Sequence, residues 1–376
     1  MMKKREANVE LLRLITMLMI VMGHLINHGE LIYVAREGSV SYNIAWGLFG
    51  LTIPAVDIYV LISGYFLVES KFSSWKLFKL AIQVWFYTMT ITLYFWISGS
   101  TEHVLKEMVY SLTPIISDFY WFITMYVGMY ILSPLLNHFV KSLSKRQLQC
   151  VLALCFVLFS VWTNIFYYTS GMNIAGGISI TWFVVLYMFG AYIRLYDVGK
   201  GSYGKWMLWG IILDLLIPIS RVVIVMLNST PLEKLIFLDD LLWGYSVFYQ
   251  YNSMLALGAA VCLFVGFLGV KIKSQRISGI ILLFASTSLG VYLIHEHGYI
   301  REALWNKVGA CNWLGKWYLL PRIITTTLAV YVVCSAVELL RRFLFRPIER
   351  NEKLQEKFRR IDMKLKGLWN GDADAP

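Results

Sequence analysis

An apolar segment near the start of the chain carries four ionisable side chains. The segment NVELLRLITMLMIVMGHLINH, residues 8–28, contains Glu10, Arg13, His24 and His28. Arg13 and His24 are eleven residues apart, about three turns of an α-helix, so both lie on one helix face about 16 Å apart along the axis. Glu10 precedes Arg13 by one turn and can offset its charge. Histidine is well suited to proton transfer near neutral pH, so this stripe offers a cation at one end and an acid–base group at the other.

The same stripe also has a purely structural interpretation. The Arg13 guanidinium can extend to lipid phosphates, and the His24 imidazole can be hydrogen-bonded to a neighbouring helix. Ionisable residues elsewhere in apolar segments favour a functional interpretation, because each costs about 2.5–3.5 kcal/mol at bilayer depth and therefore faces a cavity or a partner. These further residues are Asp57, Asp214, Arg221, His295, Glu296, His297, Arg322 and Glu338.

Asp57 and the sequence His295-Glu296-His297 are the next candidates for chemistry. Asp57 lies near the middle of an apolar segment, too deep to reach the membrane surface. His295, Glu296 and His297 have the types of side chain that bind metals. Positions i and i+2 of a helix point about 200° apart, however, so His295 and His297 are not expected to share a site, and we predict no metal cofactor. Asp57 and Glu296 are the carboxylates that could orient an imidazole.

Composition places the chain among integral membrane proteins. Of its 376 residues, 58% are hydrophobic and 15% are charged, and the mean hydropathy is +0.61. Soluble globular proteins are about 25% charged. The five cysteines form no CxxC pair, so neither a disulfide framework nor a cysteine zinc site is indicated.

Apolar segments of spanning length recur along the whole chain, and we predict about ten transmembrane helices. The ten segments are 9–28, 44–68, 77–98, 118–137, 148–167, 178–196, 205–227, 246–270, 279–300 and 318–341. With the N-terminus in the cytoplasm, most of the 34 Lys and Arg residues fall on the cytoplasmic side, as the positive-inside rule requires. Both termini are therefore predicted to be cytoplasmic. The net charge of +11 arises from basic residues on the cytoplasmic face, where anionic lipid is their ordinary partner. We therefore predict no nucleic-acid partner.

The predicted fold is thus an all-α, multi-pass membrane domain over residues 1–341, followed by a basic tail over residues 342–376. The tail spacing indicates an amphipathic helix on the inner leaflet and then a disordered end. The opening MMKKRE is interpreted as the start of a retained first helix, since no cleavage site follows the apolar run. There is no internal repeat, and no two halves carry matching Gly- or Pro-broken spans.

Several of these stretches together resemble the integral-membrane acyltransferase 3 family. Arg13 and His24, with ten residues between them, are similar to its first-span signature. VDIYVLISGYFLV (Val56–Val68) resembles its apolar segment ending in Ser-Gly-Tyr or Ser-Gly-Phe, although Ile-Tyr replaces the usual paired Phe. WFITMYVGMYILSPLLN (Trp121–Asn137) and SLGVYLIHEH (Ser288–His297) resemble two later spans of the family. The similarities run over nearly the whole chain in the expected order.

The resemblance implies a bacterial inner-membrane enzyme that takes an acyl group, most often acetyl, from cytoplasmic acyl-CoA. It delivers this group to a hydroxyl of a cell-envelope or extracellular glycan. It implies that His24 is essential and that Arg13 accompanies it. The family's Arg pair after the second span is replaced by Lys76 and Lys79, which can bind CoA phosphates as point charges.

Elementary chemistry agrees with this assignment, because a thioester needs mainly positioning, a base and a water-poor site. His24 could act as the base or could take the acyl group first as a nucleophile. Both routes require a continuous cavity between the basic inner surface and His24. The alternative is a proton-coupled permease for a small polar or lipid-linked substrate, which buried Asp, Arg and His also fit. The sequence shows no inverted repeat and no pair of broken helices, and this counts against a permease. No motif indicates the acceptor glycan or the oligomeric state.

Overall fold

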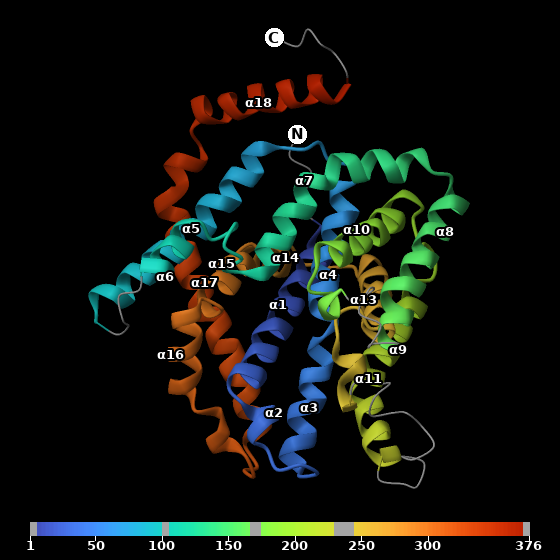
Figure 1. The fold of residues 1–376 in the computed structure, drawn as a ribbon, viewed down its shortest axis with the longest axis vertical. Helices are drawn as coiled ribbons and strands as arrows, with labels where there is room; N and C mark the ends of the chain where they lie inside the picture. The colour runs from blue at the N-terminus through green and yellow to red at the C-terminus, as the bar shows by residue number, and fades with distance from the viewer. Residues whose placement is uncertain (1–5, 100–104, 166–173, 229–243, 371–376) are drawn as a thin grey trace.

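The computed structural model describes residues 6–99, 105–165, 174–228 and 244–370, and within them all regular structure is helical (Figure 1). This confirms the predicted all-α fold. Among the described residues, eight helical segments are long and apolar enough to span a membrane. They are α1 (Ala7–His28), α3 with α4 (Val40–Thr52 and Pro54–Leu67), α5 (Ser74–Ile97), α7 (Trp121–Ser142), α8 to α9 (Lys145–Ile165), α11 (Tyr203–Asn228), α14 with α15 (Gln275–Ala285 and Ser288–His295) and α17 (Leu319–Glu349).

Two further predicted spans form shorter apolar helices, α10 (Ile180–Leu195) and α13 (Met254–Leu268), of 16 and 15 residues. The total of ten spans stays a prediction. Shorter elements connect the long helices: α2 (Leu31–Val34), α6 (Leu105–Leu112), the π-helical turn η1 (Val157–Trp162) before α9 (Thr163–Ile165), η3 (Ala175–Gly177), η5 (Gly244–Tyr249), α16 (Gly298–Val308), η6 (Ala310–Trp313) and α18 (Glu352–Asn370).

Several predicted boundaries differ from the structure, and three of them illustrate why. The span expected to begin at residue 246 starts as α13 at Met254, because the Ser253 hydroxyl caps it by accepting from the Ala256 N–H. The span expected to reach residue 300 ends at His295, where the chain turns into α16. The last span continues beyond residue 341 to Glu349, since an ion pair between Glu338 and Arg341 supports the helix there.

Two spans are interrupted, contrary to the expectation of unbroken helices. α3 gives way to α4 at Pro54, which lacks the N–H that a continuous helix requires. α14 gives way to α15 where the Ser286 and Thr287 hydroxyls donate to the Leu283 and Phe284 carbonyls, each at 2.7 Å. Ile53 and Ser286 keep right-handed helical dihedrals, so each span continues in nearly the same direction.

α1 occupies the centre of the molecule. It contacts α3, α4 and α13 on one side and α14, α15 and α17 on the other (Figure 1). Its apolar residues divide between two buried clusters, Val9 and Leu12 in one and Met17, Val21 and Leu25 in the other. The polar stripe of α1 is therefore shielded from lipid by the surrounding helices.

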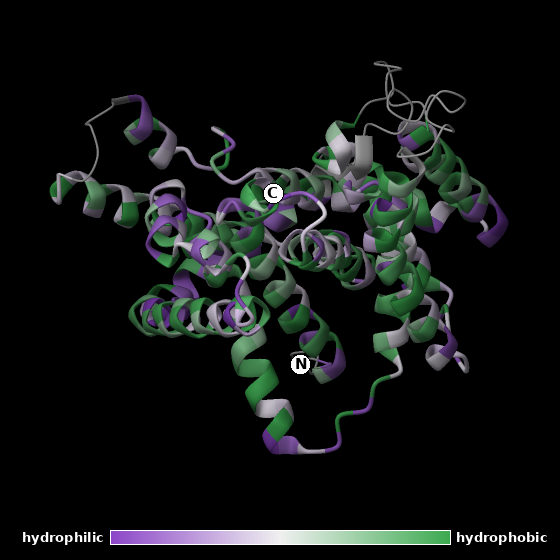
Figure 2. Ribbon diagram, turned by 90° about the horizontal axis from the view of Figure 1, so that it is seen from below, coloured by the Kyte–Doolittle hydropathy of each residue, from purple (hydrophilic) through white to green (hydrophobic). Residues whose placement is uncertain are grey.

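The outer helices carry the lipid-facing surface. α11 exposes Leu208, Trp209, Leu215 and Val222, and α17 exposes Ile324, Leu328, Val333 and Leu340. Figure 2 shows hydrophobic residues along most of the long helices of the bundle, with many hydrophilic residues at helix ends and connections. Such rows of exposed large apolar side chains are expected where the surrounding solvent is a bilayer. The chain is a multi-pass membrane protein.

α18 lies across the end of the molecule at which α1 begins (Figure 1). The Phe358 ring packs 4.6 Å from that of Phe78, and the Asp362 carboxylate accepts from the Ser74 N–H at 2.9 Å. The predicted tail helix is therefore present and docked on the start of α5. Its position on a lipid leaflet stays a prediction.

α4 and α10 pack at backbone contact through two glycines. A Cβ at Gly190 would overlap the Leu61 carbonyl, and one at Gly64 would overlap the Tyr187 carbonyl. Small residues let membrane helices approach this closely. The contact holds α4, which forms one wall of the central cavity.

We expect Gly190→Ala to lower the thermal stability of the detergent-solubilised protein. The new methyl group must push α4 and α10 apart, an overpacking effect of about 1–3 kcal/mol. Melting followed by intrinsic fluorescence measures it. Gly279→Ala is the matched control, because a Cβ there meets nothing within 4 Å and alanine favours the helix. Equal melting points for Gly190→Ala and the parent protein would contradict the packing argument.

Candidate active site

A cavity of about 800 Å³ follows α1 along most of its length. Glu10, Arg13, His24 and His28 all line it. The other walls come from the α3–α4 junction, α5, α7 and α15. The structure therefore contains the continuous opening that the Arg13–His24 stripe requires.

The end of the cavity beside the start of α1 is basic. The Arg13 guanidinium donates to Glu10 at 2.7 Å, which is the expected pairing, and keeps 28% of its side chain exposed. Lys76 of α5 lines the same cavity. Lys79 is not part of the lining, and its ammonium group lies 5.9 Å from the centre of the Trp75 ring instead. Of the two lysines predicted to bind phosphate, only Lys76 is placed to do so.

Three aromatic residues of α7 form a ladder along the cavity wall. Phe122, Tyr126 and Tyr130 follow at intervals of four residues, with ring centroids 6.2 and 6.5 Å apart and nearly parallel planes. Tyr130 donates to the backbone just before α5, near the basic end. Phe122 packs 5.9 Å from the Tyr292 ring, which lies 6.4 Å from His24. The ladder thus connects the two ends of the cavity.

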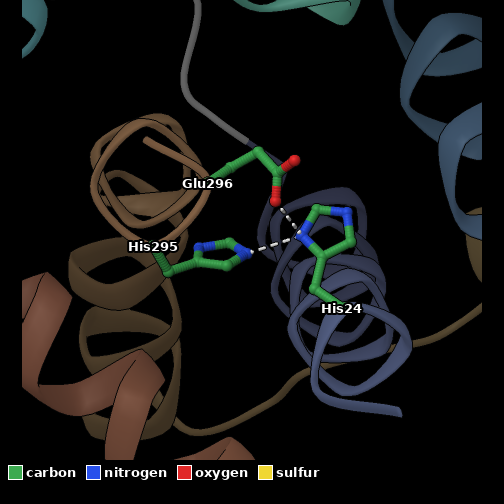
Figure 3. A group of neighbouring side chains, drawn as sticks. All are labelled: His24, His295 and Glu296. Atoms are coloured by element: carbon green, nitrogen blue, oxygen red, sulfur yellow. Dashed lines mark hydrogen bonds and ion pairs between the residues drawn. The ribbon is translucent and has the colours of Figure 1, made fainter. Parts of the chain in front are cut away.

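His24 meets His295 and Glu296 at the other end of the stripe (Figure 3). His24 Nδ1 lies 2.9 Å from His295 Nε2, with hydrogen-bond geometry. It also lies 3.0 Å from Glu296 Oε2, a contact that becomes an ion pair when His24 is protonated. His295 is fully buried, whereas His24 keeps 22% of its side chain exposed. One side chain from α1 and two from the end of α15 therefore form a compact polar cluster at the cavity.

The hydrogen bonds determine which nitrogen of His24 is free. His295 Nδ1 lies 2.5 Å from the Val291 carbonyl oxygen, which can only accept, so this nitrogen carries the hydrogen. In neutral His295 the Nε2 atom is then an acceptor, and His24 Nδ1 must be the donor. His24 Nε2 consequently bears the lone pair. Figure 3 shows this second nitrogen pointing away from both partners.

The second carboxylate oxygen of Glu296, Oε1, is fixed by a hydrogen bond. Glu296 Oε1 accepts from the Arg301 guanidinium at 2.8 Å. Glu296 Oε2, which faces His24, has no hydrogen bond among the described residues, and His28 Nε2 lies 3.4 Å from it. A carboxylate at this position stabilises a positive charge that forms on the neighbouring imidazole. The arrangement can therefore take up and release a proton at His24 Nε2.

The local sequence explains why His295 and Glu296 reach His24. α15 ends at His295, Glu296 is its C-cap, and His297 begins the turn into α16. Arg301 lies in the first turns of α16, five residues after Glu296, and its guanidinium donates to Glu296 Oε1. α15 is itself anchored against α17, where a Cβ at Gly290 would meet the Glu338 carboxylate at 2.5 Å.

Two predicted residues lie away from this cluster. The Asp57 carboxylate accepts from the Trp182 indole at 3.1 Å, is fully buried and does not line the cavity. The structure therefore gives no support to Asp57 as a group that orients His24. His297 packs 5.0 Å from the Phe119 ring, so His295 and His297 face different surroundings, as predicted.

The sequence argument missed Arg301, Tyr292 and the ladder on α7. Arg301 lies in α16, and the helix end at His295 that places it beside Glu296 was not predicted. The spacing of Phe122, Tyr126 and Tyr130 was a visible signal, because residues four apart share a helix face. That spacing is equally common in helices that simply pack against a core.

The cluster is also a set of possible metal ligands. One donor atom from each of His24, His295 and Glu296 lies within 4.8 Å of the others. The sequence argument had compared His295 with His297, its neighbour along the chain. The relevant partner is His24, which is 271 residues away in sequence.

Comparison with known protein families matches residues 6–339 to an acyltransferase domain. No curated protein and no solved structure matches the chain in the corresponding comparisons. The match includes α1, α7, α15 and all the cavity-lining residues discussed above. The protein is a membrane acyltransferase and belongs to the acyltransferase 3 family.

Proposed function

We propose that the protein transfers an acetyl group from cytoplasmic acetyl-CoA to a hydroxyl group of an extracytoplasmic cell-envelope or extracellular glycan. The observation that supports this most directly is the single cavity lined by Arg13 and Lys76 at one end and by His24 at the other. A donor and an acceptor that enter from opposite membrane faces can meet only through such an opening. The basic surface of the tail and inner loops supports a cytoplasmic position for the Arg13 end, in a bacterial inner membrane.

The donor fits the long axis of the cavity. Arg13 and Lys76 supply positive charge for the CoA phosphates at the inner end. The eleven residues from Arg13 to His24 correspond to about 16 Å of helix, a distance that suits an extended pantetheine arm. Phe122, Tyr126 and Tyr130 give that arm a mostly apolar wall.

The chemistry takes place at His24 Nε2. In the direct route His24 Nε2 accepts the proton of the acceptor hydroxyl while the hydroxyl oxygen attacks the carbonyl carbon of the thioester. The carbon–sulfur bond then breaks, and the imidazolium returns the proton to the CoA thiolate, so the products are an ester and free CoA. Glu296 stabilises the imidazolium in the interval, and His295 holds the tautomer. An acyl-His24 intermediate would use the same nitrogen as the nucleophile.

We expect His24→Ala to remain inserted and folded but to lose acetyl transfer from acetyl-CoA. Removal of a general base costs about 10²–10⁴-fold in rate. Purified protein, radiolabelled acetyl-CoA and an isolated glycan acceptor provide the assay. His138→Ala, on the exposed face of α7, is the matched control and should keep the parent rate. Full transfer by His24→Ala would refute the mechanism.

Acetyl-CoA and CoA should raise the melting point of the purified protein, because a ligand that binds only the folded state stabilises it. A permease for an unrelated substrate should respond to neither.

Arg13→Ala and Lys76→Ala should raise the CoA dissociation constant about 10- to 100-fold, the effect of losing one hydrogen bond to a charged group. Lys79→Ala is the control, since Lys79 lies outside the cavity lining. An equal loss for Lys79→Ala would mean that the cavity is not the donor site.

Deletion of the gene should remove O-acetyl signals from one surface or extracellular polysaccharide of the producing cell. Proton NMR of purified polysaccharide, before and after mild alkaline de-esterification, measures these signals. Restoring the parent gene should restore the signals, and restoring the His24→Ala gene should not. Unchanged ester content in every envelope glycan would contradict the proposed acceptor class.

A further inference from the structure

We propose that His24, His295 and Glu296 form a binding site for a zinc-type divalent ion, and that the bound ion inhibits the enzyme. The second half of this proposal rests on the proposed function, whereas the first half does not. The ion is an inhibitor that competes with catalysis and is not a cofactor.

The donor geometry is close to that of a zinc site. His24 Nδ1 lies 2.9 Å from His295 Nε2 and 3.0 Å from Glu296 Oε2, and the three atoms lie within 4.8 Å of one another. Zinc bonds of about 2.0–2.2 Å in a tetrahedron place ligand atoms about 3.3 Å apart. Small side-chain movements would therefore open the cluster enough. His28, one turn after His24, offers a fourth donor with Nε2 3.4 Å from Glu296 Oε2.

The groups around the donors are those that metal sites use. Ligating histidines donate their second N–H to a backbone carbonyl, and ligating carboxylates are hydrogen-bonded in turn. His295 Nδ1 has the Val291 carbonyl at 2.5 Å, and Glu296 Oε1 has Arg301 at 2.8 Å. Glu296 Oε2, with no hydrogen bond among the described residues, is directed at the cluster. The cavity, which His24, His28 and Glu296 line, provides access for the ion.

Metal binding and acyl transfer exclude each other at His24. A zinc ion bound to Nδ1 of the neutral imidazole leaves the ring hydrogen on Nε2. That nitrogen then has no lone pair, so it can act neither as a base nor as a nucleophile. The same ion occupies Glu296, which stabilises the imidazolium. The bound ion therefore inhibits by keeping the hydrogen on His24 Nε2, and it does not have to block the path of the acyl donor.

Binding is tested on the full-length protein in detergent after treatment with a chelator. Titration with ZnCl₂ in a calorimeter should show one strong site per chain, while MgCl₂, an oxygen-seeking ion, should show none. Glu296→Gln and His295→Gln should each weaken zinc binding at least about tenfold. His138→Gln replaces an exposed histidine outside the cluster and should bind zinc as the parent does. A melting transition like that of the parent protein, followed by intrinsic fluorescence, shows that each variant is folded.

The proposed zinc site would be contradicted if the parent protein bound no zinc. It would also be contradicted if Glu296→Gln and His295→Gln bound zinc as tightly as the parent protein. In the transfer assay, zinc should inhibit the parent enzyme and the chelator should reverse the inhibition. Activity that is lost on chelation and restored by zinc would overturn the inhibitory role. Zinc binding to the cluster without acetyl transfer by the metal-free protein would refute the proposed function and leave the metal site standing.

Discussion

The cost of placing ionisable side chains in hydrocarbon determines how this molecule is built. Glu10, Arg13, His24 and His28 all lie on α1, and none of them can face acyl chains without a penalty of several kcal/mol. The structure meets this constraint by surrounding α1 with α3, α4, α13, α14, α15 and α17. The outer helices, such as α11 and α17, carry the apolar residues that contact lipid. A polar passage through the protein interior is the consequence.

The walls of this passage are held by contacts that tolerate little change. Glycines bring the backbones of α4 and α10 together on one side. On the other side the buried Glu338 carboxylate accepts from Tyr87 at 2.7 Å and from Arg341 twice at 2.9 Å, which ties α5 to α17. A buried charge of this kind is strongly destabilising once its partner is lost. The cavity is thus bounded by close contacts, although ionisable side chains line it.

The cluster around His24 combines two requirements that compete. Efficient proton transfer needs one fixed tautomer and a carboxylate near the ring, and His295 and Glu296 supply both. Those partners place three good metal donors beside one another at an accessible cavity. Orientation of an imidazole by a second histidine is therefore the feature from which we infer sensitivity to zinc-type divalent ions. Orientation by a backbone carbonyl would avoid it.

Local pattern was enough to identify eight spans, the shared face of Arg13 and His24 and the tail helix, because hydrophobic length and helical periodicity are properties of short segments. The Ser253 cap and the hydroxyl bonds of Ser286 and Thr287 are also local, yet apolar runs through them masked the helix ends. Partners distant in sequence could not be assigned in this way. Asp57 and Glu296 were equal candidates to orient His24, and only the tertiary structure turned Asp57 toward Trp182 and Glu296 toward His24.

Lys76 and Lys79 show the same division, since both are cations on the first turns of α5 and only Lys76 faces the cavity. The amino-acid sequence alone indicated a helical membrane protein with a histidine and an arginine on one helix face. Packing decided which carboxylate, which lysine and which second histidine meet them. The physical reason is that helix periodicity gives the direction of a side chain around its own axis, whereas its neighbours depend on how helices rotate and approach one another.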